Sequence, residues 1–205
     1  MDRIGAEAIM AKKSERNDSR RYMLVSDGVG KHIDTGILAN DLDTEVELEY
    51  EALQPFQSCY LFGSRGAGSF GVAVTSASVI RSDLGGVQQS FPHALGVRNT
   101  LSYGTGRFSL NGTLLVNLSP VNNPLPIIYL YAMNYGYPMN HALLGIVRCR
   151  IRKSGILARD FLPVPKGSRF HGMTTLAPEN CLLDLVTMAY FGNAGAGGDF
   201  GIEEI

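Results

Sequence analysis

The stretch that decides the fold is Thr44-Glu45-Val46-Glu47-Leu48-Glu49-Tyr50-Glu51. Acidic residues occupy every second position, and apolar residues fill most of the positions between them. Successive side chains of a β-strand point to opposite faces of a sheet, so this period of two predicts a strand. One of its faces is buried and the other, acidic face is turned to water.

Similar short apolar runs recur from Tyr22 onward. We expect further strands at Tyr22–Val25, His32–Thr35, Cys59–Phe62, Phe70–Thr75, Phe108–Leu110, Leu114–Leu118, Ile127–Ala132, Leu143–Arg152 and Ile156–Pro163. Turn residues separate them, and Asn111-Gly112 is a strong signal for a two-residue hairpin because both residues accept a positive φ. Many short strands with no long helical period predict an all-β fold, a two-sheet antiparallel jelly-roll sandwich.

The composition agrees with this fold and excludes several classes of protein. The 205 residues include 24 Gly and 9 Pro, and a glycine inside a helix costs about 1 kcal/mol, so strands joined by turns fit better than a helical bundle. The net charge is -1, which leaves no basic surplus for a phosphate backbone, and we expect no nucleic-acid partner. No run approaches the roughly 18 apolar residues of a membrane-spanning helix, so we expect no membrane partner.

The first 21 residues differ from the rest. Residues 2–13 suit a short helix with one apolar side, and a polar stretch without periodicity follows. A helix this short is marginal alone in water. We therefore divide the chain into an N-terminal arm at residues 1–21, either frayed or docked on a neighbouring subunit, and a sandwich at residues 22–205. The arm lacks the apolar core of a signal peptide, which predicts synthesis in a cytoplasm without export.

The sequence offers no strong metal or cofactor site, and we expect neither. The three cysteines are Cys59, Cys149 and Cys181. They lie far apart without a C-x-x-C pair, so we expect them to be reduced and buried. Gly66–Gly71 matches a dinucleotide-binding pattern, but strand-like residues follow it where that site needs a helix. Asp41 and Asp43 lie in a turn that is either plain or a calcium ligand, and calcium binding stays open.

Three carboxylates on one face of the strand at residues 44–51 raise an enzymatic alternative. Same-face neighbours on a strand are about 6.6 Å apart at the backbone, and retaining glycosidases hold two carboxyl groups about 5–5.5 Å apart. Glu45, Glu47 and Glu49 resemble the Glu-x-Asp-x-Glu catalytic strand of laminarinase-type glycoside hydrolases. However, Glu47 stands in place of the Asp, and the chain has no Trp for stacking on sugars. We favour a solvated polar face and keep polysaccharide hydrolysis as the alternative.

Tyrosines and asparagines gather where one strand runs into a loop. The candidates for ligand binding are Tyr131, Asn134, Tyr135, Tyr137 and Asn140. Tyrosine offers flat apolar faces and asparagine offers hydrogen bonds at low entropic cost, a mixture that binding loops use. A sugar or protein contact here is one interpretation of this cluster. The alternative is that alternate tyrosines simply cover one face of a sheet.

Three parts of the chain, in order, resemble laminin-G-like, concanavalin A-like domains of phage and prophage virion proteins. They are Tyr22–Gly28 with His32–Ile37, then Leu61–Arg65, then Leu157–Val164 with Leu183–Thr187 and Tyr190–Gly195. The resemblance covers roughly residues 22–200, and residues 75–123 match in pattern only. It implies a concanavalin A-like sandwich that is part of a virion.

The resemblance, together with the lack of a catalytic constellation, predicts a non-catalytic bacteriophage structural protein. It would be a capsid decoration, tail fibre or tail-associated component, with a lectin-like sandwich. Its partners would be other virion proteins or further copies of itself, reached through residues 1–21, and its ligand a glycan of the host surface. Besides the hydrolase, a free lectin without an assembly partner is an alternative.

Overall fold

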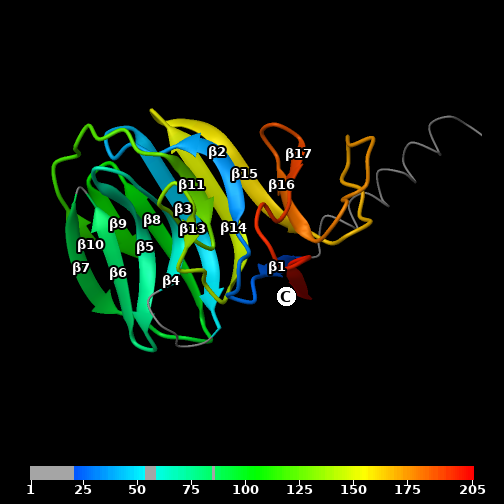
Figure 1. Cartoon of the computed structure of the whole chain (residues 1–205), viewed down its shortest axis with the longest axis horizontal. Helices are drawn as coiled ribbons and strands as arrows, with labels where there is room; N and C mark the ends of the chain where they lie inside the picture. Colours follow the sequence, from blue (N-terminus) through cyan, green and yellow to red (C-terminus); the bar gives the residue numbers. More distant parts are fainter. Residues whose placement is uncertain (1–20, 54–58, 85) are drawn as a thin grey trace, which may run out of the picture.

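The computed structural model describes residues 21–53, 59–84 and 86–205, which form two β-sheets packed face to face (Figure 1). The larger sheet contains β1 (Tyr22–Val25), β3 (Thr44–Ala52), β8 (Arg98–Gly104), β9 (Arg107–Leu110), β10 (Thr113–Asn117), β14 (Leu144–Lys153), β15 (Ile156–Val164), β16 (Cys181–Asp184), β17 (Ala189–Phe191) and β18 (Gly201–Glu204). Its order is β10-β9-β8-β3-β14-β15-β16-β17, and β1 pairs with β14 and β18.

The smaller sheet contains β2 (Ile33–Leu38), β4 (Cys59–Arg65), β5 (Ser69–Ser76), β6 (Val79–Leu84), β7 (Val87–Pro92), β11 (Ile127–Leu130), β12 (Met133–Asn134) and β13 (Pro138–Met139). Its order is β13-β12-β4-β5-β6-β7, and β11 pairs with both β4 and β2. All pairings in the two sheets are antiparallel except that of β12 with β4. The predicted all-β, two-sheet sandwich is confirmed. The described residues contain no helix, and hence none that could cross a membrane.

β3 lies in the middle of the larger sheet between β8 and β14, and its alternation is as predicted. Val46, Leu48 and Tyr50 are at most 1% exposed and face the smaller sheet, whereas the glutamates lie half-buried on the outer face. Burying a large apolar side chain stabilises a fold by roughly 1.5–3 kcal/mol. The period of two therefore fixes both the orientation of β3 and the polar character of the outer face.

Aromatic rings fill the space between the sheets. Tyr103 of the larger sheet packs edge-on against Phe62 and Phe70 of the smaller one, with ring centroids 5.4 and 4.8 Å apart. Its hydroxyl donates a hydrogen bond to the carbonyl of Asp83 and accepts one from the amide of Gly71 at 2.9 Å. Tyr103 thus joins the two sheets by polar as well as apolar contacts, and its burial raises the pKa of the phenol.

The sequence analysis missed β6, β7 and β8, and also the short strands β12, β13 and β18. β6 reads Val-Ile-Arg-Ser-Asp-Leu, and its buried face includes Ser82, so the apolar pattern is broken. β7 is an edge strand that is exposed on one face and only half-buried on the other. A strand that buries little apolar surface leaves little periodic signal.

Two local predictions are confirmed, and one falls outside the described residues. Asn111 and Gly112 form the β9–β10 hairpin with φ of 50° and 79°. All three cysteines are free and buried. The predicted N-terminal arm, residues 1–21, lies outside the described residues except for Arg21.

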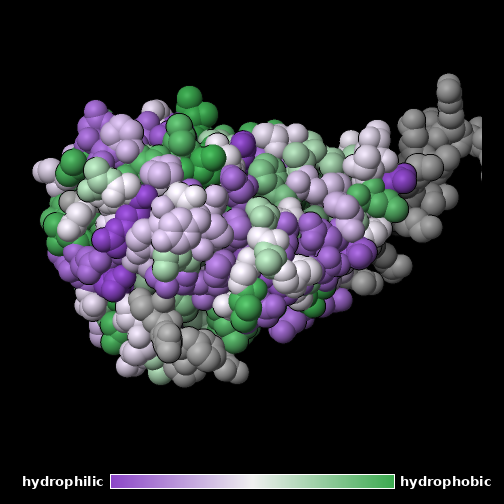
Figure 2. Space-filling model, in the orientation of Figure 1, coloured by the Kyte–Doolittle hydropathy of each residue, from purple (hydrophilic) through white to green (hydrophobic). Residues whose placement is uncertain are grey.

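In Figure 2, hydrophilic residues cover most of the visible face, and hydrophobic ones gather in small groups at its margins.

Candidate functional site

A row of polar side chains crosses the outer face of the larger sheet. Strand pairing places Ser109 of β9 opposite Ser102 of β8, Ser102 opposite Glu47 of β3, and Glu47 opposite Arg150 of β14. Residues directly opposite each other on antiparallel strands project from the same face. We call these four residues the cross-strand row.

A second, shorter line runs beside the cross-strand row. Thr100 of β8 lies opposite Glu49 of β3, and Glu49 lies opposite Arg148 of β14. Both lines arise because two alternating sequences meet in register: acidic residues at 45, 47 and 49 face basic residues at 148, 150 and 152. The sequence analysis treated the acidic face as solvated. The Arg-Cys-Arg-Ile-Arg alternation of residues 148–152 was the signal that could have identified its partners.

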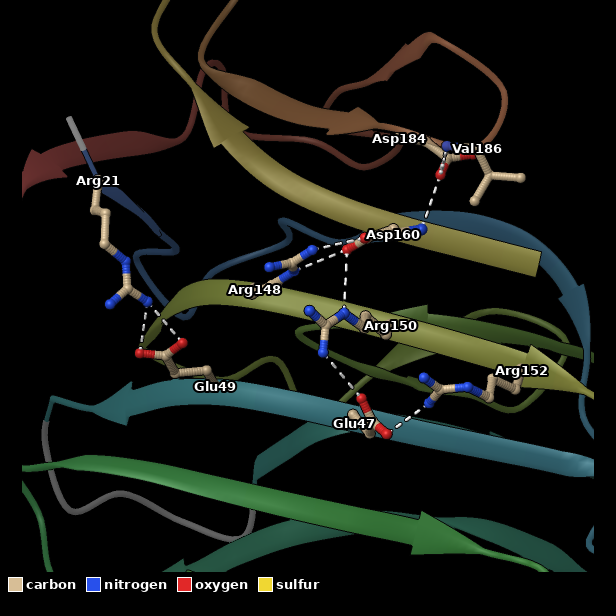
Figure 3. Close-up of polar contacts among 9 residues, drawn as sticks. All are labelled: Arg21, Glu47, Glu49, Arg148, Arg150, Arg152, Asp160, Asp184 and Val186. Carbon is tan, nitrogen blue, oxygen red and sulfur yellow. Dashed lines mark hydrogen bonds and ion pairs between the residues drawn. The ribbon is translucent and has the colours of Figure 1, made fainter. Parts of the chain in front are cut away.

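Arginines hold both glutamates of these lines in place (Figure 3). Glu47 accepts hydrogen bonds from Arg152 Nη1 at 2.5 Å and from Arg150 Nη1 at 3.3 Å. The Glu49 oxygens accept from Arg21 Nη2 at 2.8 and 2.7 Å. These pairs are partly exposed, so each contributes at most about 1 kcal/mol to stability. Their clearer effect is to fix the positions of the carboxylates.

Asp160 of β15 closes the end of the cross-strand row. It lies opposite Arg150, and its two oxygens accept from Arg148 Nε at 2.9 Å and Nη2 at 2.7 Å. This two-point geometry is the strongest form of an arginine–carboxylate pair. The Asp160 side chain is only 10% exposed, and its hydrogen bonds raise the pKa of the Arg148 guanidinium.

A hollow of about 340 Å³ lies over these strands. Its lining combines long charged side chains with short ones: Glu47, Glu49, Arg148 and Arg150, against Thr100, Ser102, Ser109 and Gly112, with Leu48 and Leu101 completing it. The step in side-chain length between β3–β14 and β8–β9 explains the depression. Its volume is at the lower end of the range for small-molecule sites, about 300–1,000 Å³.

The polar groups that line this hollow can form hydrogen bonds, beside the apolar surface of its leucines and side-chain stems. Carboxylates accept hydrogen bonds, guanidinium groups donate them, and serine and threonine hydroxyls can do both. In the described part of the protein, the hydroxyls of Thr100, Ser102 and Ser109 have no side-chain or backbone partner. They are free to bind a ligand rich in hydroxyl groups.

The predicted catalytic alternative finds only part of its geometry here. Glu47 and Glu49 line the hollow, but Glu45 does not, and its Oε1 accepts from Thr105 Oγ1 at 3.2 Å. Glu47 and Glu49 both accept hydrogen bonds from guanidinium groups. No aromatic residue is among those that line the hollow.

The structure gives two of the predicted tyrosine-loop residues internal roles. Tyr131 is fully buried with a φ of 67°, and its hydroxyl donates to the carbonyl of Leu24 at 2.5 Å. Asn134 is 4% exposed, and its Nδ2 donates to the Ile127 carbonyl at 2.8 Å. Its Oδ1 accepts from the Gly136 amide at 2.8 Å. These polar atoms bind the protein's own backbone.

The other three residues of that prediction lie at or near the surface of the smaller sheet. The Arg65 guanidinium lies 5.3 Å from the centroid of the Tyr135 ring and donates to its hydroxyl at 3.1 Å. Tyr137 is 60% exposed, and Asn140 is exposed with a φ of 53°. They belong to the β12–β13 region and not to the hollow. Their ligand-binding role stays a prediction.

The carboxylates of the calcium candidate bind groups of the protein itself. Asp41 is 3% exposed, and its oxygens accept from the amides of Gly106 and Val121, each at 3.0 Å. Asp43 accepts from Lys153 Nζ at 2.5 Å. In residues 21–53, 59–84 and 86–205, no group of three or more His, Cys, Asp or Glu side chains is placed to hold a metal ion.

Comparison with known proteins gives a likeness of fold and nothing finer. No family model and no curated protein matches the chain. A mutant of NanB sialidase from Streptococcus pneumoniae matches 66% of this chain and 26% of its own at 16% identity, with a TM-score of 0.48. The mouse laminin alpha1 chain, domains LG4-5, matches 80% of this chain and 46% of its own at 13% identity. Its TM-score is also 0.48.

The chain therefore spans about a quarter of that sialidase chain and less than half of that laminin chain. Both TM-scores are below 0.5 and both identities below 25%. The strand pairings themselves establish the sandwich, and nothing about activity follows from these likenesses.

Proposed function

We propose that the protein is a non-catalytic structural protein of a bacteriophage virion that binds a glycan through the hollow on its larger sheet. Within the virion it is a decoration, fibre or tail-associated component. The resemblance of three ordered stretches to phage virion domains supports the location. The observation that carries the binding role is the cross-strand row, in which hydroxyl, carboxylate and guanidinium groups meet in register.

Such a site suits a protein that is displayed in many copies on one particle. Its lining has no aromatic ring to stack on a sugar, so affinity depends on hydrogen bonds, each worth only about 0.5–1.5 kcal/mol net. A single site of this kind is weak. Several copies on one particle raise the overall affinity through their effective concentration, by up to about 10²–10⁴-fold.

Assembly through residues 1–21, with other virion proteins or with further copies, is part of the proposal. Arg21 ends this segment, and its carbonyl accepts from the Ile205 amide at 2.9 Å while its side chain pairs with Glu49. Arg21 itself is therefore held beside the hollow. Light scattering after size exclusion should show an oligomer for the full chain and a monomer for a chain that starts at Tyr22. Two monomers would contradict assembly through this segment and favour the free lectin.

The hydrolase alternative has one observation in its favour, since Glu47 and Glu49 line the hollow. A screen on a glycan array and a reducing-end assay on soluble polysaccharides separate the two functions. We expect binding without release of reducing ends by the full chain. Release of reducing ends that disappears in Glu47→Gln, with folding retained, would establish the hydrolase and refute the proposal.

A further inference from the structure

We infer that the hollow takes a linear, uncharged polysaccharide that lies across the strands, from Ser109 over Ser102 and Glu47 to Arg150. This inference rests on the proposed glycan-binding function. It adds the class of the ligand and the direction in which it lies.

The direction follows from the register of the strands. The cross-strand row occupies four adjacent strands, β9, β8, β3 and β14. Neighbouring strands are about 4.8 Å apart, so the row is roughly 14 Å long. That length exceeds one sugar ring and matches a short oligosaccharide. A polymer lying this way meets a polar side chain at every strand it crosses.

The two ends of the row are unequal. At the β14 end, Asp160 of the next strand pairs with Arg148 and Arg150 and so holds both guanidinium groups at this end of the hollow. At the β9 end, Gly112 of the hairpin turn leaves open space where a side chain would stand. Beyond β9 only the edge strand β10 remains. A long polymer can therefore leave the hollow over this edge while one end stays at Arg150.

We infer an uncharged ligand because the charged side chains that line the hollow are already paired with one another or with neighbouring residues. Two glutamates and two arginines line the hollow, and each is already held by an opposite charge. An acidic ligand that approaches the arginines also lies beside Glu47 and Glu49. A cationic ligand that approaches these glutamates also lies beside the arginines. The two negative and two positive charges of the lining sum to zero, so they offer a charged ligand no net attraction, whereas neutral hydroxyl groups bind with every pair intact.

The free hydroxyls lie on the β8–β9 side of the hollow. Ser102 and Ser109 face each other on β8 and β9, and Thr100 lies one pair further along β8. A hydroxyl can donate to one sugar oxygen and accept from the next. This side therefore suits the repeating hydroxyl groups of a neutral chain.

The first test is calorimetric titration of the full-length protein with oligosaccharides of increasing length. The probes are neutral glucan, mannan and galactan series from dimer to hexamer, and acidic oligogalacturonates of the same lengths. We expect one neutral series to bind with an affinity that rises about tenfold from dimer to tetramer and then levels off. We expect the acidic series to bind at least tenfold more weakly.

Matched variants test the direction in which the polysaccharide lies across the strands. Ser102→Val lies in the middle of the cross-strand row and should weaken every length by about tenfold. Ser109→Val lies at its open end and should abolish only the gain with length. Ser90→Val on β7 of the smaller sheet is the control, because it is the same change on an exposed strand position. Circular dichroism and thermal melting confirm that each variant folds.

The outcomes separate this inference from the proposed function. Tighter binding of the acidic series refutes an uncharged ligand but leaves a glycan-binding protein. A gain with length that Ser109→Val does not reduce refutes the direction across the strands. Binding of neither series by the intact protein refutes the glycan-binding function itself.

Discussion

Tyr131 and Tyr137 stand six positions apart in the same aromatic cluster, yet the structure places one in the core and the other in solvent. The sequence could not distinguish them, because the change of direction after β11 depends on a positive φ at Tyr131. Its hydroxyl satisfies the Leu24 carbonyl on β1, 107 positions away in the chain. Contacts over that distance leave no local pattern.

This difference gives a prediction at the scale of the residue. Tyr131→Phe leaves the buried Leu24 carbonyl without its donor, which costs roughly 1–3 kcal/mol in the free energy of unfolding. Tyr137→Phe, at a 60% exposed position, should change it by less than about 0.5 kcal/mol. Urea denaturation followed by fluorescence measures both. Equal effects of the two substitutions would contradict the assigned burial.

At the scale of the element, a strand or hairpin can be predicted where its pattern is contained in a few neighbouring residues of the sequence. β3 and the β9–β10 hairpin could be predicted because their signals lie within a few residues. The hollow could not, because Glu47 and Arg150 are 103 positions apart and meet only through the register of β3 with β14. Of the residues that line the hollow, the sequence analysis singled out only Glu47 and Glu49, as part of the hydrolase alternative. The arginines and serines of the hollow were not singled out.

The turn between β16 and β17 depends on one buried carboxylate. Asp184 is fully buried, and its oxygens accept from the amides of Asp160, Val186 and Thr187 and from the Thr187 hydroxyl. Figure 3 shows the first of these bonds, which joins β15 to the turn. The residue therefore holds the closing hairpin against the strand that carries Asp160.

We expect Asp184→Ala to destabilise the protein by about 2–4 kcal/mol, because several amides lose their acceptor at once. The control is Asp199→Ala, which removes a surface pair with Lys166 at 3.2 Å and should cost less than about 1 kcal/mol. Midpoints of urea denaturation compare the two. A similar shift for both variants would argue against Asp184 as the anchor of this turn.

At the scale of the whole molecule, three histidines make stability depend on pH. Burial lowers the pKa of His32, His93 and His141 in the folded chain. The unfolded chain keeps the ordinary value of about 6.5. Above that pH both states are neutral at these sites. As the pH falls below it, the unfolded chain takes up protons that the folded chain does not, so the free energy of unfolding decreases.

We therefore expect the melting temperature to fall from about pH 7 to about pH 5, by roughly 2–4 °C for each kcal/mol lost at this chain length. His93→Gln should flatten part of this dependence, because it removes one buried imidazole. His171→Gln, at an exposed position, should leave the dependence unchanged. A melting temperature that rises on acidification would contradict the account.

The most direct test of the account is a map of amide chemical shifts in the full-length protein titrated with the neutral oligosaccharide that binds best. We predict that the largest shifts fall on β8, β9, β3 and β14 around Ser102 and Glu47, with no new reducing ends formed. Shifts confined to the loop of Tyr135 to Asn140 would contradict the hollow as the binding site. Cleavage of the ligand during the titration would contradict a non-catalytic function.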